Sequence, residues 1–163
     1  MAQIISATYK LDDMDSFFDE AYNDIIRKLV EMGEEAYNTA FAKGRYQNIT
    51  GNLRSSLGYV VAIDGRIVKE GGFKQVRGRG ENSQRVEFTT GTGKEVKFWA
   101  KGKAGDGSEG SRKGLEYAKE LASQYKKGVT LIVVAGMDYA SYVNSRGYDV
   151  IDSAEAKVIT KLK

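Results

Sequence analysis

The sequence predicts an α+β protein in which a long N-terminal helix packs on a mainly antiparallel β-sheet, with a protruding β-hairpin arm and a second, shorter helix. Three observations indicate this fold class. Residues 12–43 have helical periodicity, residues 59–70 and 85–99 each read as two strands around a tight turn, and residues 113–128 have a second helical pattern. Because hairpins join antiparallel neighbours, the sheet is expected to be antiparallel. The 163 residues are expected to form one domain, residues 1–163, within which residues 71–111 form a flexible loop and the hairpin arm.

The first half of the chain is expected to contain a short strand, the long helix and a hairpin. Residues 3–10 suit a short strand. From Asp12 to Lys43, apolar residues recur at steps of three and four, which is the spacing of an amphipathic helix, with Gly33 as a candidate bend. Residues 59–70 then place two β-branched runs around an Asp-Gly pair, the combination favoured in a two-residue hairpin turn.

The second half of the chain is expected to contain the arm, the second helix and one more strand. The arm is the hairpin at 85–99, which follows a glycine-rich basic loop at 71–84. The remaining expectations are a helix at 113–128, a very apolar and central strand at 129–136, a short turn or helix at 139–147, a strand at 148–152, and an unassigned C-terminal element at 153–163.

The residue content excludes several classes of function. Cys and His are both absent, which removes disulfides, thiol nucleophiles, most zinc sites and the usual acid–base residue near neutral pH. No stretch approaches the roughly 20 apolar residues of a membrane span, and the N-terminus lacks the pattern of a signal peptide. We therefore expect a soluble chain made in the cytoplasm with no membrane partner, in which only Asp, Glu, Lys, Tyr and Ser remain for catalysis.

Charge is unevenly distributed along the chain, although the net charge is only +3. Residues 12–43 hold nine acidic and three basic residues, a net charge of −6, whereas residues 66–103 hold ten basic and four acidic residues, a net charge of +6. Such separation is typical of nucleic-acid binding, of contact between one copy's basic region and another copy's acidic region, or of solvated faces with no partner. The sequence leaves these explanations open.

One stretch matches a nucleotide-binding pattern. Residues 105–110, GDGSEG, have the glycine spacing of dinucleotide-binding turns. The run before them is charged and alternating, whereas the corresponding strand of a dinucleotide-binding unit is buried and continuously apolar. A flexible loop is therefore the better interpretation.

Another short pattern would suit a nuclease. Glu95-Val96-Lys97 has the E-x-K spacing of a superfamily in which a carboxylate holds Mg²⁺ and Lys polarises a phosphate. In an alternating strand, both charged side chains are instead expected to face solvent. A Mg²⁺-dependent nuclease is therefore the weakest of the functions considered.

A basic nucleic-acid-binding module is the stronger alternative function. Arg77, Arg79 and Arg85 lie in or beside the glycine-rich loop, with aromatic residues not far along the chain. Arginines contact phosphates and aromatic rings stack on bases, so this region suits nucleic acid. The same region also suits a solvated arm or a contact with another protein. The aromatic residues considered are Phe73, Phe98 and Trp99.

Two stretches together resemble a known family. TGNLRSSLGYVV at residues 50–61 resembles the T-G-x-L-R-x-S-I signature of phage neck and tail-completion proteins. VAGMDYASYVNSRG at residues 134–147 resembles their later Y-A-x-Y-V-E-x-G signature, with Asn144 where the family usually has Glu and two residues before the glycine. As a pair, the stretches are similar to the gp-ten-like family of phage HK-ninety-seven, minor structural proteins that join the filled head to the tail.

The resemblance implies a structural virion protein of the head–tail junction, made in the cytoplasm of the bacterial host. Such a protein acts by oligomeric assembly and has no enzymatic activity. Together with the residue content, this role leads us to expect no catalytic residues, metal or cofactor. Its implied partners are further copies of itself in a homo-oligomeric ring, other phage connector or tail proteins and, as a further candidate, packaged DNA.

The first signature is also interpretable from its residues. Thr50 can cap a short helical turn, Leu53 and Leu57 would pack inward four apart, and Gly58 would end the turn. Such a corner is either a contact surface for a neighbouring subunit or a simple joint between helix and sheet. The predicted interface residues are Arg54 and Ser55, facing outward at this corner, Arg77 and Arg79 in the basic loop, and Tyr139 and Tyr142, because Tyr is enriched in interfaces.

Overall fold

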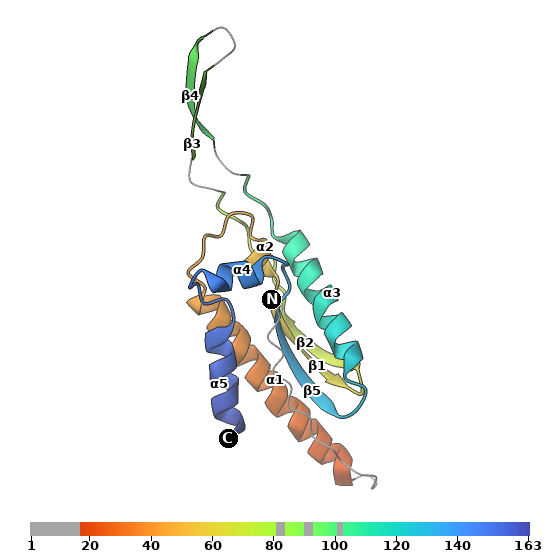
Figure 1. The fold of residues 1–163 in the computed structure, drawn as a ribbon. Helices are drawn as coiled ribbons and strands as arrows, with labels where there is room; N and C mark the ends of the chain where they lie inside the picture. The colour runs from red at the N-terminus through yellow and green to blue at the C-terminus, as the bar shows by residue number, and fades with distance from the viewer. Residues whose placement is uncertain (1–16, 81–83, 90–92, 101–102) are drawn as a thin grey trace.

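The computed structural model describes residues 17–80, 84–89, 93–100 and 103–163, and it confirms the α+β class (Figure 1). The long helix α1 is observed over Phe17–Lys43, while the predicted strand at 3–10 lies outside the described residues. Within the described ranges, no helix is long and apolar enough to cross a membrane. The other elements are α2 (Asn52–Ser55), β1 (Leu57–Ile63), β2 (Arg66–Gly72), β3 (Gln84–Thr89), β4 (Glu95–Ala100), α3 (Ser108–Gln124), β5 (Val129–Ala135), α4 (Ala140–Ser145) and α5 (Asp152–Leu162).

The predicted first hairpin is confirmed as the pair β1–β2. Its turn residues Asp64 and Gly65 have φ angles of 50° and 83°, the left-handed values that a primed two-residue turn requires. The Asp64 carboxylate also accepts a hydrogen bond from the backbone N–H of Gly128, at 2.8 Å, which ties the turn to the start of β5.

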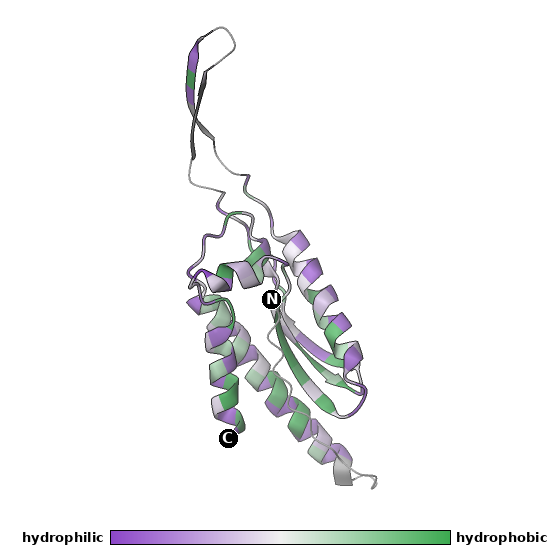
Figure 2. Cartoon of the chain, viewed as in Figure 1, coloured by the Kyte–Doolittle hydropathy of each residue, from purple (hydrophilic) through white to green (hydrophobic). Residues whose placement is uncertain are grey.

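The main sheet is antiparallel, with the strand order β2–β1–β5. The prediction that residues 129–136 form the central strand is wrong, because β1 is central and β5 lies beside it on one side only. All seven residues of β5 are nevertheless buried, since helices cover both faces of the sheet there. The strand β5 is hydrophobic along most of its length (Figure 2). This pattern indicates a strand that is covered on both faces, and it does not require a central position in the sheet.

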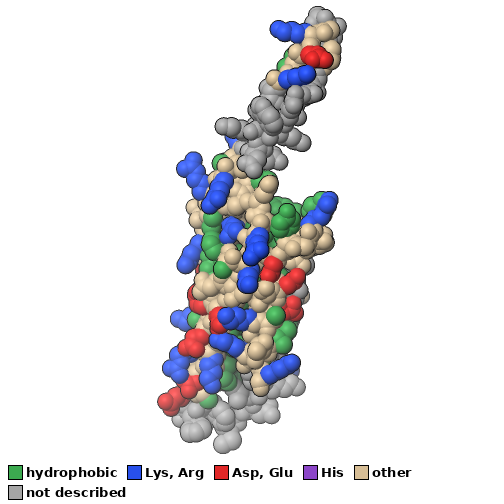
Figure 3. All heavy atoms as spheres, turned by 90° about the vertical axis from the view of Figure 1, so that its left-hand side faces the viewer, with side chains coloured by type: hydrophobic (Ala, Val, Ile, Leu, Met, Phe, Trp, Pro, Cys, Tyr) green, Lys and Arg blue, Asp and Glu red, His purple; other side chains and the backbone are tan. Residues whose placement is uncertain are grey.

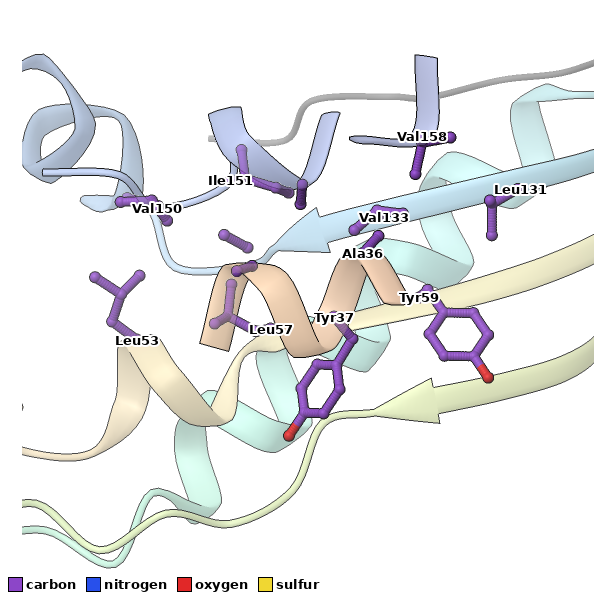
Figure 4. Close-up of a cluster of buried hydrophobic side chains, with 14 of the residues drawn as sticks. Ala36, Tyr37, Leu53, Leu57, Tyr59, Leu131, Val133, Val150, Ile151 and Val158 are labelled. Atoms are coloured by element: carbon purple, nitrogen blue, oxygen red, sulfur yellow. The ribbon is translucent and has the colours of Figure 1, made fainter. Parts of the chain in front are cut away.

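Two apolar layers, one on each face of the main sheet, stabilise the body. Successive residues of β1 point to opposite faces and therefore belong to opposite layers. Tyr59, labelled in Figure 4, and Val61 lie in the layer that contains α1 and α5, whereas Val60 and Ala62 lie in the layer that contains α3. Charged contacts join α5 to α1 at the rim, where Glu35 pairs with Lys157 at 3.0 Å and with Lys161.

The predicted arm is confirmed as a separate two-stranded sheet formed by β3 and β4, which projects from the body (Figure 1). Residues 73–80 lead into it and residues 103–107 lead back to the body.

The C-terminal part differs from the prediction at three places. Helix α3 begins at Ser108, five residues before the predicted start, and it includes one glycine of the expected loop, Gly110. The short helix at α4 is confirmed, but residues 148–152 form no strand. Val150 and Ile151 are instead fully buried just before α5, where their β-branched side chains pack in the core. The segment after them, which the sequence analysis left unassigned, is the helix α5.

Gly33 has a packing function rather than the predicted role as a bend. The helix α1 is continuous through this residue, and a Cβ atom built there would overlap the aromatic ring of Tyr59. The glycine therefore allows α1 to approach β1 closely at the centre of the core.

We predict that Gly33→Ala destabilises the protein by about 1–3 kcal/mol, the usual cost of overpacking a core. Urea unfolding followed by circular dichroism measures this change. In an exposed helix the same substitution would stabilise by about 1 kcal/mol, so the sign is diagnostic. Asn38→Ala, on the exposed side of α1, is the control and is expected to stabilise slightly, by about 0.5 kcal/mol, because Ala has the higher helix propensity. A stabilised Gly33→Ala protein would contradict the close packing of α1 on Tyr59.

Candidate functional site

The corner at residues 50–58 has the predicted inward packing but ends differently. Leu53 and Leu57 are buried, as expected, and the Thr50 hydroxyl accepts a hydrogen bond from the backbone N–H of Asn52 at 3.3 Å. Gly58 does not end the helical turn, because α2 stops at Ser55 and Gly58 is the second residue of β1. The ring of Phe73 covers the Gly58 backbone, in the space that a side chain would need.

Ser55 does not face outward, so this prediction is wrong. Its side chain is fully buried, and its hydroxyl accepts a hydrogen bond from the backbone N–H of Val76 at 2.8 Å. The same hydroxyl lies 3.4 Å from the Val76 carbonyl oxygen, to which it donates. Ser55 therefore anchors the loop that leads into the arm, and it cannot contact a neighbouring subunit in this conformation.

Arg54 is partly buried and directed at the end of α1. Its guanidinium donates to the carbonyl oxygens of Phe41, at 2.9 Å, and of Gly44. It also lies over the rings of Phe41 and Tyr46, 5.2 and 5.3 Å from their centroids. A cation is favourable at the negative end of a helix dipole, so Arg54 fixes the C-terminus of α1 against the corner.

The base of the arm is held by backbone contacts with residues 48–51. The N–H groups of Arg79 and Gly80 donate to the carbonyl oxygens of Asn48 and Ile49, at 2.8 and 3.0 Å. The N–H of Gly78 donates to the carbonyl oxygen of Gly105 at 2.8 Å, which joins the two segments that lead to and from the arm. Residues 78–80 of the glycine-rich loop are therefore bonded to the body ahead of the arm.

The glycines of GDGSEG are used for packing within the chain. A Cβ atom at Gly105 or Gly110 would overlap the backbone of Thr50 or Asn52. The space that a bound pyrophosphate would need beside these glycines is occupied by residues 50–52, which agrees with the rejection of a dinucleotide site.

Three of the predicted residues meet in one cavity. The cavity has a volume of about 550 Å³, and we call it the arginine cavity because Arg54, Arg77 and Arg79 line it. Its other lining residues are Phe41, Tyr46, Gln47, Asn48, Val76 and Gly80. Burial raises the pKa of Tyr46 to about 12, against the opposing effect of the Arg54 charge, so the Tyr46 hydroxyl is neutral at physiological pH.

The other two predicted residues, Tyr139 and Tyr142, line a second depression of about 690 Å³, which we call the tyrosine groove. They are 41% and 58% exposed, respectively. Arg146 lies 5.0 Å from the centre of the Tyr142 ring and donates to its hydroxyl at 2.6 Å. Burial raises the pKa of Tyr139, with a hydrogen bond from Thr50 acting in the opposite direction. The groove also includes residues 46–53, Glu109, Lys113, Met137, Asp138, Val143 and Tyr148.

Sequence reasoning did not find the residues that connect these two depressions. Tyr46, Gln47 and Asn48 line both of them, so the arginine cavity and the tyrosine groove form adjoining surfaces at the arm end of the body. In the view of Figure 3, Lys and Arg side chains lie along the whole face of the body, whereas the Asp and Glu side chains drawn on the body begin farther from the arm. No sequence motif marks residues 46–48, whose role follows from the tertiary fold.

The structure does not support a nuclease site at Glu95 and Lys97 or base stacking by Phe73. Lys97 and Glu95 form an exposed ion pair at 3.3 Å, and the described part of the chain has no group of three or more Asp and Glu that could hold a metal ion. Phe73 packs between Gly58 and Gly114 in the layer below α3, so it is not available for stacking on a base. The side chains of Arg85, Phe98 and Trp99 lie outside the described part.

Comparison of the chain with protein-family models, curated proteins and solved structures finds no match.

We predict that Ser55→Ala lowers the free energy of unfolding by about 1–3 kcal/mol, because the buried N–H of Val76 loses its acceptor. Chemical denaturation gives the value. Ser141→Ala, at an exposed position of α4, is the matched control and is expected to change stability by less than about 0.5 kcal/mol. Equal stability of the two variants would show that the Ser55 hydroxyl does not hold the arm loop.

Proposed function

We propose that this chain is a structural protein of the phage head–tail junction, acting in the neck or in tail completion by oligomeric assembly and by joining head to tail. In this proposal it occupies the virion, binds further copies of itself and other connector or tail proteins, and catalyses no reaction.

The observation that carries the proposal is the meeting of the two family-like stretches, which are more than 70 residues apart in the sequence. Leu57 pairs with Ala135 and Gly58 with Val134 across β1 and β5. The N–H of Gly136 also donates to the carbonyl oxygen of Ser56 at 3.2 Å. Residues 50–53 and 137–146 then continue side by side along the tyrosine groove. Two stretches that resemble one family in sequence therefore build one surface.

The composition of that surface supports assembly. Tyr139 and Tyr142 expose large rings beside the buried Leu53 and Met137, and Lys113 and Arg146 stand at the same groove. Tyr and Arg dominate the energetic centres of protein interfaces, because they combine a large apolar contact area with polar groups that still form hydrogen bonds.

The arm gives a second kind of support. A two-stranded sheet is at best marginally stable alone in water, and β3 and β4 pair only with each other among the described strands. An arm of this kind gains stability when another protein covers it, as in an assembly.

We predict that phage particles made without this protein accumulate as filled heads and free tails that do not join. Negative-stain electron microscopy of a lysate in which the gene is interrupted provides the measurement, with the intact gene supplied in trans as the control. Normal, infectious virions in the absence of the protein would refute the assignment.

We further predict that Tyr139→Ser combined with Tyr142→Ser gives a folded protein that fails to complement the interrupted gene, because the interface loses its two exposed rings. The readout is the titre of infectious particles, together with the amount of the protein in purified virions. Val68→Ser combined with Ile159→Ser is the matched control, since these side chains are 41% and 42% exposed and lie outside the groove. Full complementation by the tyrosine variant would exclude the groove as the contact surface.

A further inference from the structure

The arginine cavity contains three cationic side chains, and the described residues that line it supply no counter-charge. Arg54, Arg77 and Arg79 line it, and neither Asp nor Glu does. Among the described residues, none of these three arginines forms an ion pair with a carboxylate. Guanidinium groups gathered without a carboxylate repel one another, so this arrangement favours the binding of an anion from outside.

The Arg54 side chain and the backbone around the cavity are held in place by the chain itself. Arg54 is held by two backbone carbonyl oxygens and lies over two aromatic rings. The backbone on either side of Gly78 is also tied down, because the Asn48 side-chain amide donates to the Arg77 carbonyl oxygen at 3.1 Å and the Arg79 N–H donates to the Asn48 carbonyl oxygen. Side chains that start from ordered positions lose less conformational entropy on binding.

Arg77 and Arg79 have the properties of ligand-binding side chains. Both are exposed, and neither donates a side-chain hydrogen bond to another described residue, so their guanidinium donors remain available. Arg54 is the fixed member of the group, whereas Arg77 and Arg79 come from the loop that leads into the arm. The planar guanidinium fork matches two oxygens of a phosphate.

We propose that the arginine cavity binds a backbone phosphate of double-stranded DNA. This inference goes beyond the assembly role and does not depend on it.

Two observations favour a nucleic-acid backbone over an acidic protein segment. First, positive charge is not confined to the cavity but continues along residues 66–103, which carry the net charge of +6. Second, the cavity lies at the arm end of the body, where the view of Figure 3 shows Lys and Arg side chains, while the acidic side chains drawn on the body lie farther from the arm. A duplex presents a phosphate charge about every 1.7 Å along its axis, so it can engage an extended cationic surface and the cavity at the same time.

The test uses the purified full chain and a 30-base-pair fluorescent duplex of arbitrary sequence, with binding followed by fluorescence anisotropy at several salt concentrations. We expect Arg77→Gln combined with Arg79→Gln to weaken binding about 100-fold at low salt, roughly tenfold for each charge-assisted contact. The slope of log affinity against log salt should also become shallower by about 2, since each phosphate contact contributes about 0.9.

The matched control is Lys126→Gln combined with Lys127→Gln. This variant also loses two positive charges, but at exposed positions between α3 and β5, at the end of the body away from the arm. It should change affinity by less than about threefold, as expected for charges that contact no phosphate. Circular dichroism confirms that both variants are folded.

Arg54→Lys provides an independent measurement, since it keeps the charge and removes the guanidinium fork. We expect weaker DNA binding with an unchanged net charge. If this variant does not fold, the Arg77 and Arg79 result decides alone.

Three outcomes would overturn the proposal: no binding of the duplex by the parent protein, equal loss in the cavity and control variants, or unchanged affinity after removal of Arg77 and Arg79. Competition with polyglutamate separates the two polyanions. Specific binding of polyglutamate at the cavity without binding of DNA would assign the cavity to an acidic protein partner instead. The virion experiments above have separate readouts, so loss of DNA binding and loss of head–tail joining can be told apart.

Discussion

The contact between residues 48–52 and the two segments at the base of the arm is the constraint on which the rest of the functional surface depends. Ser55 binds the Val76 backbone from inside, and the Arg79 and Gly80 N–H groups bind the carbonyl oxygens of Asn48 and Ile49 from outside. Glycines make this approach feasible, because a Cβ atom at Gly78 would overlap the Ile49 carbonyl oxygen. Without these contacts, the arginine loop would have no defined position relative to the corner.

The same segment serves two surfaces at once. Residues 46–48 line both the arginine cavity and the tyrosine groove. This shared stretch therefore places a cationic surface directly beside an aromatic one. An assembly protein that both contacts neighbours and receives a polyanion needs these surfaces side by side but chemically different. Binding in the cationic cavity is expected to weaken steeply as salt rises, whereas binding in the tyrosine groove, which adds the apolar contact of two exposed rings to charged residues of both signs, is expected to weaken less. The two proposed interactions are therefore separable by ionic strength.

Local patterns in the sequence predicted the elements well, and tertiary packing explains the rest. The period of α1 and the Asp64-Gly65 turn depend on neighbouring residues alone, and both were found as expected. Ser55, by contrast, was expected to face outward because Leu53 and Leu57 pack inward, yet its hydroxyl is the acceptor for the N–H of Val76, 21 residues farther along the chain. Val150 and Ile151 have strand propensity but were recruited into the core between α4 and α5. Only three-dimensional contacts could decide these cases.

The glycines show the same limit most clearly. Of the 19 glycines, several were interpreted as soft breaks because the residue type permits many conformations. At Gly33, Gly110 and Gly114, glycine is instead needed because there is no room for a side chain. The helix backbone at these positions lies directly against Tyr59, Asn52 and Ser56, respectively. The sequence alone does not show whether a glycine provides conformational freedom or allows close packing, because both roles depend on the absence of a Cβ atom. The loop that carries the arginines is bonded to the body at Val76 and Gly78–Gly80, whereas β3 and β4 pair only with each other among the described strands.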